Sequence, residues 1–243
     1  MRLYIMEMAK APDDGTSRAG APVPAYLIQT DDGTNVLVDT GFSAEQIATM
    51  RAARGDDTTG SVNLVTDELA KIGVKPEDVR YLVATHLDQD HAGGTDLFPN
   101  AEIIVQRTHH EAATSGQYPR FEITRAHWDA DGLRYRFVDG DTELLPGIEL
   151  IESSGHVPGH QSVLVRLPET GSVLLAIDAI TLSFGDATPE TRPVGPYDTD
   201  ADATRASTRK LVDLAEREGV AFTVYGHDAN GWKTLKKAPE YYQ

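Results

Sequence analysis

Within the segment THLDQDHAGG, four side chains that can bind a metal ion stand in six consecutive positions. They are His86, Asp88, Asp90 and His91, and they follow directly after the apolar run 81–85. A set of imidazole nitrogens and carboxylate oxygens suits Zn²⁺, Fe or Mn²⁺, whereas two imidazoles are unusual around Ca²⁺ or Mg²⁺. One such motif alone is also compatible with a polar surface turn, so the metal interpretation depends on further ligands elsewhere.

Three more polar side chains each follow an apolar run of the chain. His156 lies in SSGHVPGH after residues 148–152, Asp178 follows residues 172–177, and His227 lies in YGHD after residues 222–225. Each of them, taken alone, is more typical of an ordinary polar residue at the end of a strand. Because functional groups gather at the loops of a rigid scaffold, their recurrence at four strand ends favours a shared metal site.

The elements that must position these side chains are mainly short strands. The apolar runs predict strands at residues 3–7, 25–30, 35–40, 81–85, 102–106, 148–152, 162–167, 172–177 and 222–225, and helices at 61–72 and 201–218. Residues 10–24, 113–132 and 182–200 are expected to be long loops, either plain surface connections or binding loops. This pattern predicts an α+β fold with two sheets and helices outside them.

Composition limits the functions that the chain can have. It has 243 residues, 40% of them hydrophobic, which we interpret as a single domain over residues 1–243. The net charge of −16 argues against binding to nucleic acid or to a membrane surface, and the absence of cysteine excludes thiolate sites and disulfides. Glu7 and Lys10 interrupt what would be the core of a signal peptide, and no apolar stretch is long enough to span a bilayer. We therefore expect a soluble cytoplasmic protein with a small-molecule substrate.

The succession HLDQDHAGG, SSGHVPGH, AIDA and YGHD resembles the metallo-β-lactamase superfamily. Within that superfamily, the segments EIIVQRTHHEAA, GHVPGHQSVLVRL and GSVLLAIDA are similar to those of the N-acyl-homoserine lactonases. The resemblance extends from Ala25 to His227. It implies an αββα sandwich, two mixed β-sheets flanked by helices, with a metal centre between the sheets.

The resemblance also implies a role for each residue of the site. His86, Asp88 and His156 would bind one divalent metal ion, Asp90, His91 and His227 would bind the second, and Asp178 would bridge the two. Zinc is the expected metal, with manganese or iron as alternatives, and a hydroxide shared by the metals would be the nucleophile. Asp90 would also protonate the leaving alkoxide.

Other side chains are expected to support the ligands or to stay apart from them. Asp39 either buttresses the ligands or caps a turn, and His160 is expected to orient His156 or its loop. We expect His109, His110 and His127 to be solvated.

Two positions depart from the family pattern. Asp88 stands where the family has a second histidine, and this makes the expected dinuclear centre formally neutral and weaker as a Lewis acid. Thr181 stands where the lactonases have a tyrosine, three residues after the bridging aspartate, and it would contact the substrate with a shorter reach. Tyr118 and Tyr197 are candidate replacements because they lie in the expected loops.

These residues predict a hydrolase that opens a lactone ring, with an N-acyl-homoserine lactone as the leading substrate. The alternatives are a metallo-hydrolase of another ester or of a phosphodiester, a non-haem iron redox protein, and a binding protein with a vestigial site. The expected ligand positions are all filled, which argues against the last of these.

Overall fold

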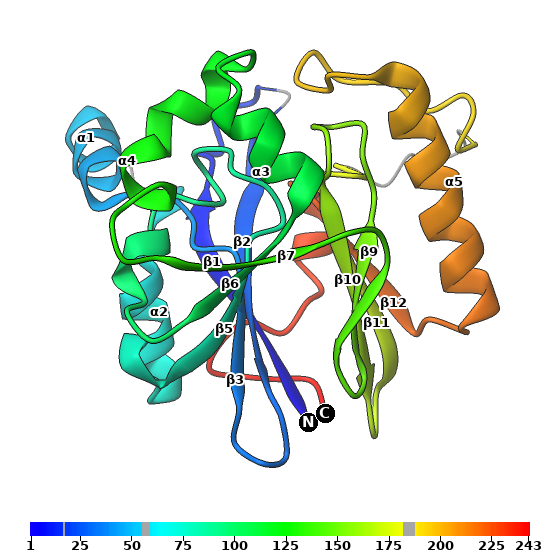
Figure 1. Cartoon of the computed structure of the whole chain (residues 1–243), viewed down its shortest axis with the longest axis horizontal. Helices are drawn as coiled ribbons and strands as arrows, with labels where there is room; N and C mark the ends of the chain where they lie inside the picture. Colours follow the sequence, from blue (N-terminus) through cyan, green and yellow to red (C-terminus); the bar gives the residue numbers. More distant parts are fainter. Residues whose placement is uncertain (17, 55–58, 182–187) are drawn as a thin grey trace.

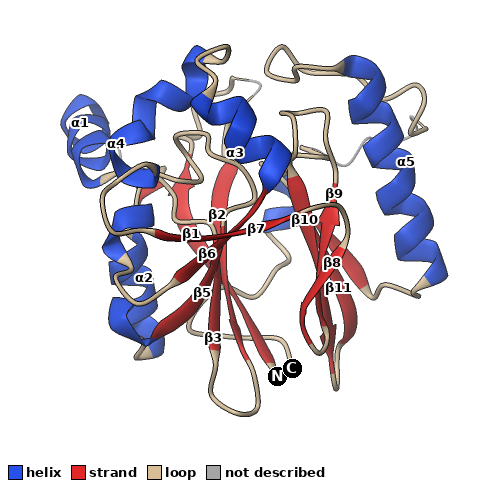
Figure 2. Ribbon diagram, viewed as in Figure 1, coloured by secondary structure: helices blue, strands red, loops and turns tan. Residues whose placement is uncertain are grey.

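The fold is known from a computed structural model that describes residues 1–16, 18–54, 59–181 and 188–243. Its strands form two mixed sheets (Figures 1 and 2). One sheet has seven strands in the order β4-β1-β2-β3-β5-β6-β7, and the other has five in the order β12-β11-β10-β9-β8. The strands are β1 (Arg2–Lys10), β2 (Pro22–Gln29), β3 (Asn35–Val38), β4 (Ser61–Val62), β5 (Val79–Val83), β6 (Glu102–Gln106), β7 (Arg134–Val138), β8 (Thr142–Leu145), β9 (Ile148–Glu152), β10 (Gln161–Leu167), β11 (Gly171–Ile177) and β12 (Phe222–Tyr225).

Helices cover the outer faces of the two sheets (Figure 2). Helices α1, α2 and α4 lie on the outer side of the seven-stranded sheet, and the long helix α5 lies against the five-stranded sheet (Figure 1). The helices are α1 (Ala44–Arg54), α2 (Val65–Ile72), α3 (Arg107–Thr114), α4 (Arg125–Trp128), α5 (Ala201–Arg217) and α6 (Ala229–Trp232), with 3₁₀ segments at Pro76–Asp78, Thr95–Leu97 and Pro119–Thr124. The αββα sandwich expected from the sequence is confirmed.

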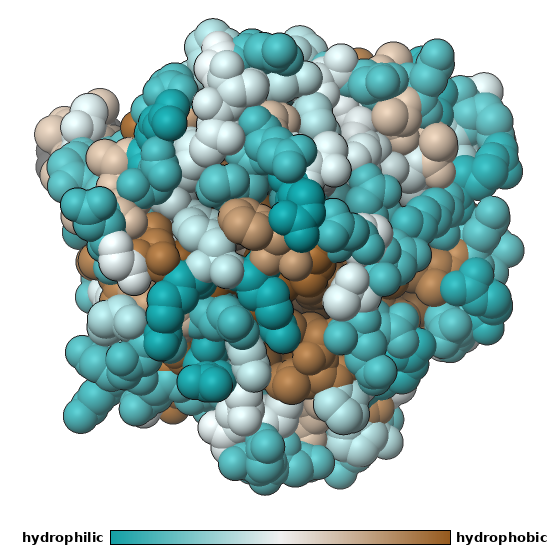
Figure 3. All heavy atoms as spheres, in the orientation of Figure 1, coloured by the Kyte–Doolittle hydropathy of each residue, from teal (hydrophilic) through white to brown (hydrophobic). Residues whose placement is uncertain are grey.

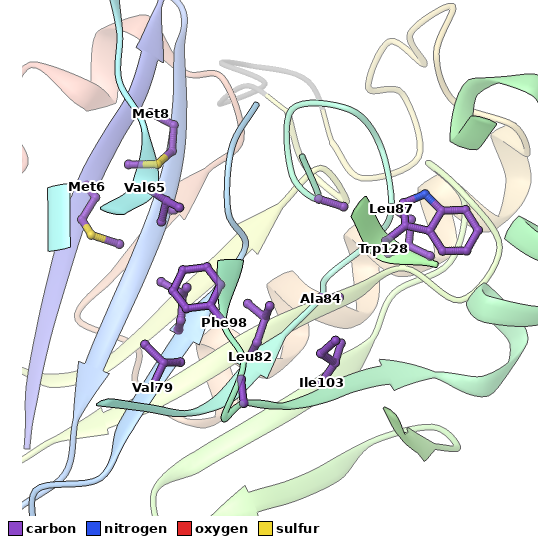
Figure 4. Close-up of a cluster of buried hydrophobic side chains, with 14 of the residues drawn as sticks. Met6, Met8, Val65, Val79, Leu82, Ala84, Leu87, Phe98, Ile103 and Trp128 are labelled. Carbon is purple, nitrogen blue, oxygen red and sulfur yellow. The ribbon is translucent and has the colours of Figure 1, made fainter. Parts of the chain in front are cut away.

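Strands β2, β3 and β6 of the seven-stranded sheet are buried on both faces, which explains their nearly continuous apolar sequences. In β1, Leu3 and Ile5 pack into the core between the sheets, while Met6 and Met8 pack under the helices together with Val65 of α2 (Figure 4). Successive side chains of a strand point to opposite faces, so one strand supplies both cores. A third cluster joins α5 to the outer face of the five-stranded sheet.

The directions of the strands bring the polar strand ends together. β3 and β5 are parallel, β9 and β11 both pair antiparallel with β10, and β11 is parallel to β12. Within each sheet, the strands that precede a candidate ligand therefore end at the same rim. The β2–β3 turn and both chain termini lie at the opposite end of the molecule (Figure 1).

Several expected elements differ from those observed. The expected helix over residues 61–72 is instead the short strand β4 followed by α2, because Ser61 and Val62 pair with the edge of β1 and the backbone of Leu64 is still extended. β7 and β8 were not predicted. The expected loop 113–132 contains a 3₁₀ segment and α4, and part of the expected loop 182–200 lies outside the described residues.

Polar side chains cover most of the face seen in Figure 3, as the charged composition predicts. Among the described residues, no helix is both long enough and apolar enough to cross a membrane.

Candidate metal centre

Six of the seven candidate ligands form two adjoining groups at the rim between the sheets. His86, His156 and Asp178 form one group and Asp90, His91 and His227 form the other, and within each group the ligand atoms lie within 4.8 Å of one another. Asp178 Oδ2 is 3.5 Å from His156 Nε2 and 3.2 Å from His227 Nε2. One carboxylate oxygen therefore faces both groups.

A buried carboxylate orients one histidine of each group. Asp39 Oδ2 accepts a hydrogen bond from His91 Nδ1 at 2.8 Å and another from the hydroxyl of Thr85 at 2.8 Å. Since that hydroxyl donates to Asp39, its oxygen accepts from His86 Nδ1 at 3.0 Å. In their neutral form both imidazoles thereby keep their proton on Nδ1 and present a bare Nε2, the form that binds a metal. Asp39 thus lies behind the ligands, the first of the two arrangements expected from the sequence.

The other two histidines are held in the same way by segments that are distant in the sequence. His156 Nδ1 pairs with Asp198 Oδ1 at 2.9 Å, and His227 Nδ1 donates to the carbonyl of Pro22 at 2.8 Å. All four Nδ1 atoms are occupied behind the site, so all four Nε2 atoms are directed to its centre.

The backbone is strained at this rim. The non-glycine residues with positive φ among those described are Asp39 at 61°, Ile177 at 51° and His227 at 54°. A side chain at Gly226 would meet the carbonyl oxygen of Ile177 at 2.5 Å, so glycine is required where His227 and Asp178 approach each other. Left-handed non-glycine residues each cost about 1–3 kcal/mol and are found chiefly at functional sites.

The residues present fit a pair of metal ions. His86 Nε2, His91 Nε2 and Asp178 Oδ1 are buried polar atoms that have no hydrogen-bond partner within the described part of the chain. Buried polar atoms are otherwise nearly always paired, so these atoms point to missing partners at the centre. The distances from Asp178 Oδ2 to the surrounding Nε2 atoms, 3.2–4.0 Å, are close to the spacing of about 3.3 Å between ligands that bind a tetrahedral metal at about 2.0–2.1 Å.

The site carries an excess of negative charge. Burial opposes protonation of the imidazoles, yet the surrounding carboxylates raise the pKa of His91 to about 10 and those of His156 and His227 to about 9. Burial would also raise the pKa of Asp178, but His227 and His91 hold it well below its usual value. A cluster that holds protons this firmly needs positive charge, which divalent cations would supply.

Asp88, the seventh candidate ligand, lies beside the first group. Its Oδ2 is 3.2 Å from His156 Nε2 and 3.3 Å from His86 Nε2. The carboxylate also accepts two hydrogen bonds from the guanidinium of Arg120. Arg120 Nε donates to Oδ1 at 2.6 Å, and Nη2 donates to Oδ2. The charge count made from the sequence covers the metals and their ligands alone, and the guanidinium of Arg120 adds a positive charge beside them.

The expectation that His109 is solvated was wrong. Its side chain is fully buried, its Nε2 accepts a hydrogen bond from the amide of Leu87 at 2.8 Å, and its Nδ1 donates to the carbonyl of Pro158 at 2.7 Å. Burial lowers its pKa to about 4, so the ring is neutral. Gly159 permits this approach, because a Cβ there would lie 2.4 Å from the amide nitrogen of His109. His109 therefore ties together the two loops that carry His86 and His156.

His160 supports the site from behind. Its Nε2 accepts a hydrogen bond from the amide of Asp178 at 3.3 Å, and its Nδ1 donates to Ser153 Oγ at 2.9 Å. It thus fixes the 153–160 loop and the backbone of Asp178. The two remaining histidines belong to neither ligand group. His110 packs against aromatic rings, and His127 pairs with Asp96.

The candidate substrate residues have different surroundings. Thr181 is half-buried at the end of the segment that follows β11. Tyr197 is exposed, the guanidinium of Arg18 lies 4.9 Å from its ring, and its carbonyl accepts from Arg120. Tyr118 packs against Phe121 beside the core under the helices.

Two supporting residues were missed by the sequence reasoning. Arg120 and Asp198 lie in expected loops, 32 and 42 residues from the side chains they contact, Asp88 and His156. The only signal was that both loops are long. Neither residue belongs to a motif with recognisable spacing.

Comparison with known proteins agrees with this geometry. The family model of the metallo-beta-lactamase superfamily matches residues 18–227. The N-acyl homoserine lactonase AiiA of Bacillus thuringiensis subsp. kurstaki is 33% identical over 229 residues, which cover 90% of this chain and 86% of the relative. The N-acyl homoserine lactonase AttM of Rhizobium johnstonii is 38% identical over 239 residues, which cover 91% and 87% of the two chains.

Solved structures show the same relationship. An N-acyl homoserine lactone hydrolase with the product N-hexanoyl-L-homoserine at its catalytic metal centre superposes with a TM-score of 0.81 at 29% identity, over 99% of this chain and 98% of that one. A variant of AiiA from B. thuringiensis with N-decanoyl-L-homoserine at its active site has a TM-score of 0.80 at 28% identity, with the same coverage. The two-sheet fold and the family match over residues 18–227 lead to one conclusion: the chain belongs to the metallo-beta-lactamase superfamily.

Proposed function

We propose that the protein is a metal-dependent lactonase that hydrolyses N-acyl homoserine lactones. The observation that carries this proposal is the pair of adjoining ligand groups with a carboxylate oxygen of Asp178 between them. The substrate class follows from the lactonase relatives, which are 33–38% identical over most of both chains, and from the product bound at the metal centre of a structural neighbour.

In this proposal the ligands divide as the family pattern implies. His86, Asp88 and His156 hold one divalent cation, with Asp178 shared between the two. Asp90, His91 and His227 hold the second. The buried Nε2 atoms of His86 and His91 and the Oδ1 atom of Asp178 have no hydrogen-bond partner among the described residues, which supports this assignment.

When bound, two divalent cations lower the pKa of water and polarise a carbonyl oxygen, which is the chemistry that ester hydrolysis requires. Hydrolysis adds hydroxide to the carbonyl carbon and breaks the bond from that carbon to the ring oxygen, which must then receive a proton. We assign this transfer to Asp90, whose side chain is 24% exposed whereas that of Asp178 is 6% exposed. The product is the open-chain N-acyl homoserine.

The identity of the metal and the location of the protein belong to the same proposal. Four imidazoles favour zinc, and the additional oxygen of Asp88 makes manganese or iron compatible with the site. A cytoplasmic location remains a prediction from the sequence.

A panel of substrates tests the proposal. Protein reconstituted with zinc, manganese or ferrous iron would be assayed with N-hexanoyl and N-decanoyl homoserine lactone, γ-butyrolactone, 4-nitrophenyl acetate and bis(4-nitrophenyl) phosphate. We expect the acyl lactones to be opened fastest, with the open-chain product identified by mass spectrometry. Turnover of the phosphodiester or the aryl ester without turnover of any lactone would instead support the alternative hydrolase.

A further inference from the structure

Arg120 connects three segments that surround the first ligand group. It lies in the 3₁₀ segment Pro119–Thr124, and its Nε donates to Asp88 Oδ1 at 2.6 Å. Its Nη1 donates to the carbonyl of Tyr197, next to the residue that holds His156. The side chain of Arg120 is 25% exposed, and the side chain of its partner Asp88 is 8% exposed. The guanidinium therefore covers the outer side of a nearly buried carboxylate.

We propose that Asp88 and Arg120 act as one unit that takes the place of a neutral imidazole in the metal centre. In this unit Asp88 supplies the oxygen to the cation, while Arg120 positions the carboxylate and balances its charge. The inference rests on the proposed function, because it assumes that the first ligand group holds a cation.

Arg120 contacts both oxygens of Asp88, and one of them, Oδ2, also lies beside the imidazoles of the first ligand group, which is the geometry that such a unit needs. Oδ2 lies 3.2 Å from His156 Nε2 and 3.3 Å from His86 Nε2, so it faces the converging imidazoles. Oδ1 accepts from Arg120 Nε on the other side of the carboxylate. Carboxylates that bind metals are commonly held by such a hydrogen bond, and the fork of an arginine matches their planar geometry.

Charge supplies the second argument. A carboxylate in place of a histidine makes the centre one unit more negative, and a guanidinium in direct contact restores that unit. An arginine cannot lose its proton in a protein, so this compensation holds at every working pH. Asp88 and Arg120 together therefore carry the same net charge as the neutral imidazole of the family pattern.

The guanidinium of Arg120 should weaken metal binding when Asp88 is removed. Arg120 Nη2 lies 3.1 Å from His156 Nε2, the atom that the first cation would use. If Asp88 is replaced by histidine, the positive charge has no carboxylate to neutralise it and stands beside the cation. Restoring the histidine of the family pattern in Asp88→His alone should therefore weaken metal binding rather than improve it.

A comparison of Asp88→His with three different residues at position 120 tests the unit. Zinc affinity would be measured by competition with a chromogenic chelator, and melting temperature would be measured with and without zinc. With Arg120 present, we expect Asp88→His to lose affinity for one zinc ion by about 10–100-fold, the range typical of losses in the support of a metal ligand. Asp88→His combined with Arg120→Gln should recover the affinity to within a few-fold of the wild type.

The third variant separates charge from shape. Asp88→His combined with Arg120→Lys keeps the positive charge and should stay as weak as Asp88→His alone. Arg125→Gln removes an equal charge from an arginine that pairs with Glu122 and Asp129, and in the Asp88→His background it should restore nothing. Circular dichroism and the metal-free melting temperature of each variant show whether it folds.

Two results would overturn the inference while leaving the proposed function intact. One is wild-type zinc affinity in Asp88→His with Arg120 present. The other is an Arg120→Gln effect on zinc affinity that is the same with Asp88 and with histidine at that position, because independent sites give additive effects. A rise in KM for the lactone in Arg120→Gln, together with such additive metal binding, would make Arg120 a substrate contact instead. Wild-type protein that binds no zinc or opens no lactone would contradict the proposed function itself.

Discussion

Replacing Asp39 by asparagine should weaken the binding of both metal ions at once. Asp39 accepts hydrogen bonds from His91 Nδ1 and from the hydroxyl of Thr85, and that hydroxyl in turn accepts from His86. His86 belongs to one ligand group and His91 to the other. A single buried carboxylate therefore sets the tautomer of one ligand at each cation.

Asparagine is the cleanest substitution at this position. The backbone of residue 39 has a φ of 61°, which asparagine tolerates better than most residues. If the amide nitrogen faces His91 Nδ1, it can only donate to it, so the proton of the imidazole moves to Nε2 and blocks the metal-facing atom. The same nitrogen then also faces the hydroxyl of Thr85, which must turn round and can no longer accept from His86. The opposite orientation would set the amide nitrogen against the backbone N–H of Thr85, which donates to the other carboxylate oxygen, and either orientation removes the charge that supports both groups.

The size of the effect follows from the loss of support behind a ligand, which typically lowers metal affinity by about 10–100-fold. That range corresponds to about 1.4–2.7 kcal/mol for each metal. Because metal binding stabilises only the folded state, the increase in melting temperature caused by zinc should shrink as well.

The assay is a chelator competition that reports both zinc ions, with Asp198→Asn as the matched control. Asp198 contacts His156 alone among the candidate ligands, so its substitution should weaken only one ion. The reasoning is refuted if Asp39→Asn retains both ions with wild-type affinity, or if it loses one ion in the same way as Asp198→Asn.

Three further predictions concern the bridge, the protons and the packing of the site. Asp178→Ala should lower metal content and melting temperature more than Asp88→Ala, because one oxygen of Asp178 faces both groups; equal losses by elemental analysis and calorimetry would contradict the bridge. The metal-free site binds protons at three imidazoles whose pKa is raised to about 9–10, so the affinity for zinc should rise from about pH 6 to about pH 9 with release of protons. Titration calorimetry in buffers of different ionisation enthalpy measures that release, and pH-independent affinity would contradict it. His109→Ala leaves a buried amide and a buried carbonyl unpaired and should cost at least about 2 kcal/mol in urea unfolding, whereas His127→Ala should cost far less.

The candidate ligands were predictable from the sequence because each follows an apolar strand. His86 and His91 share a six-residue motif, Asp178 comes directly after β11, and His227 comes two residues after β12. Short apolar runs leave a clear signal, and β6, β9 and β12 have the bounds that the sequence predicts. The exposed, charged strand β7 leaves no such signal, since Arg134 is exposed and Tyr135 and Arg136 are only half-buried.

Supporting roles were predicted for Asp39 and His160, but the contacts of His109, Arg120 and Asp198 could not be predicted, because they are made between distant segments. His109 reaches across 22 residues to Leu87 and across 49 to Pro158, and nothing local to α3 indicates that this face is buried against two loops. The hydrogen bonds from Arg120 to Asp88 depend likewise on the position of the 3₁₀ segment Pro119–Thr124 relative to the site. For this reason the sequence-based account brought the candidate ligands together but did not include the positive charge of Arg120 beside them.

The central claim, that two cations at this rim make the protein a lactonase, is tested most directly by reconstitution. Chelator-treated protein would be titrated with zinc while the opening of N-hexanoyl homoserine lactone is followed at each addition. We predict that the metal-free protein is inactive, and that the rate of lactone opening rises until two equivalents of zinc per chain are bound. A rate that saturates at one equivalent, or lactone opening that is independent of metal, would contradict the claim.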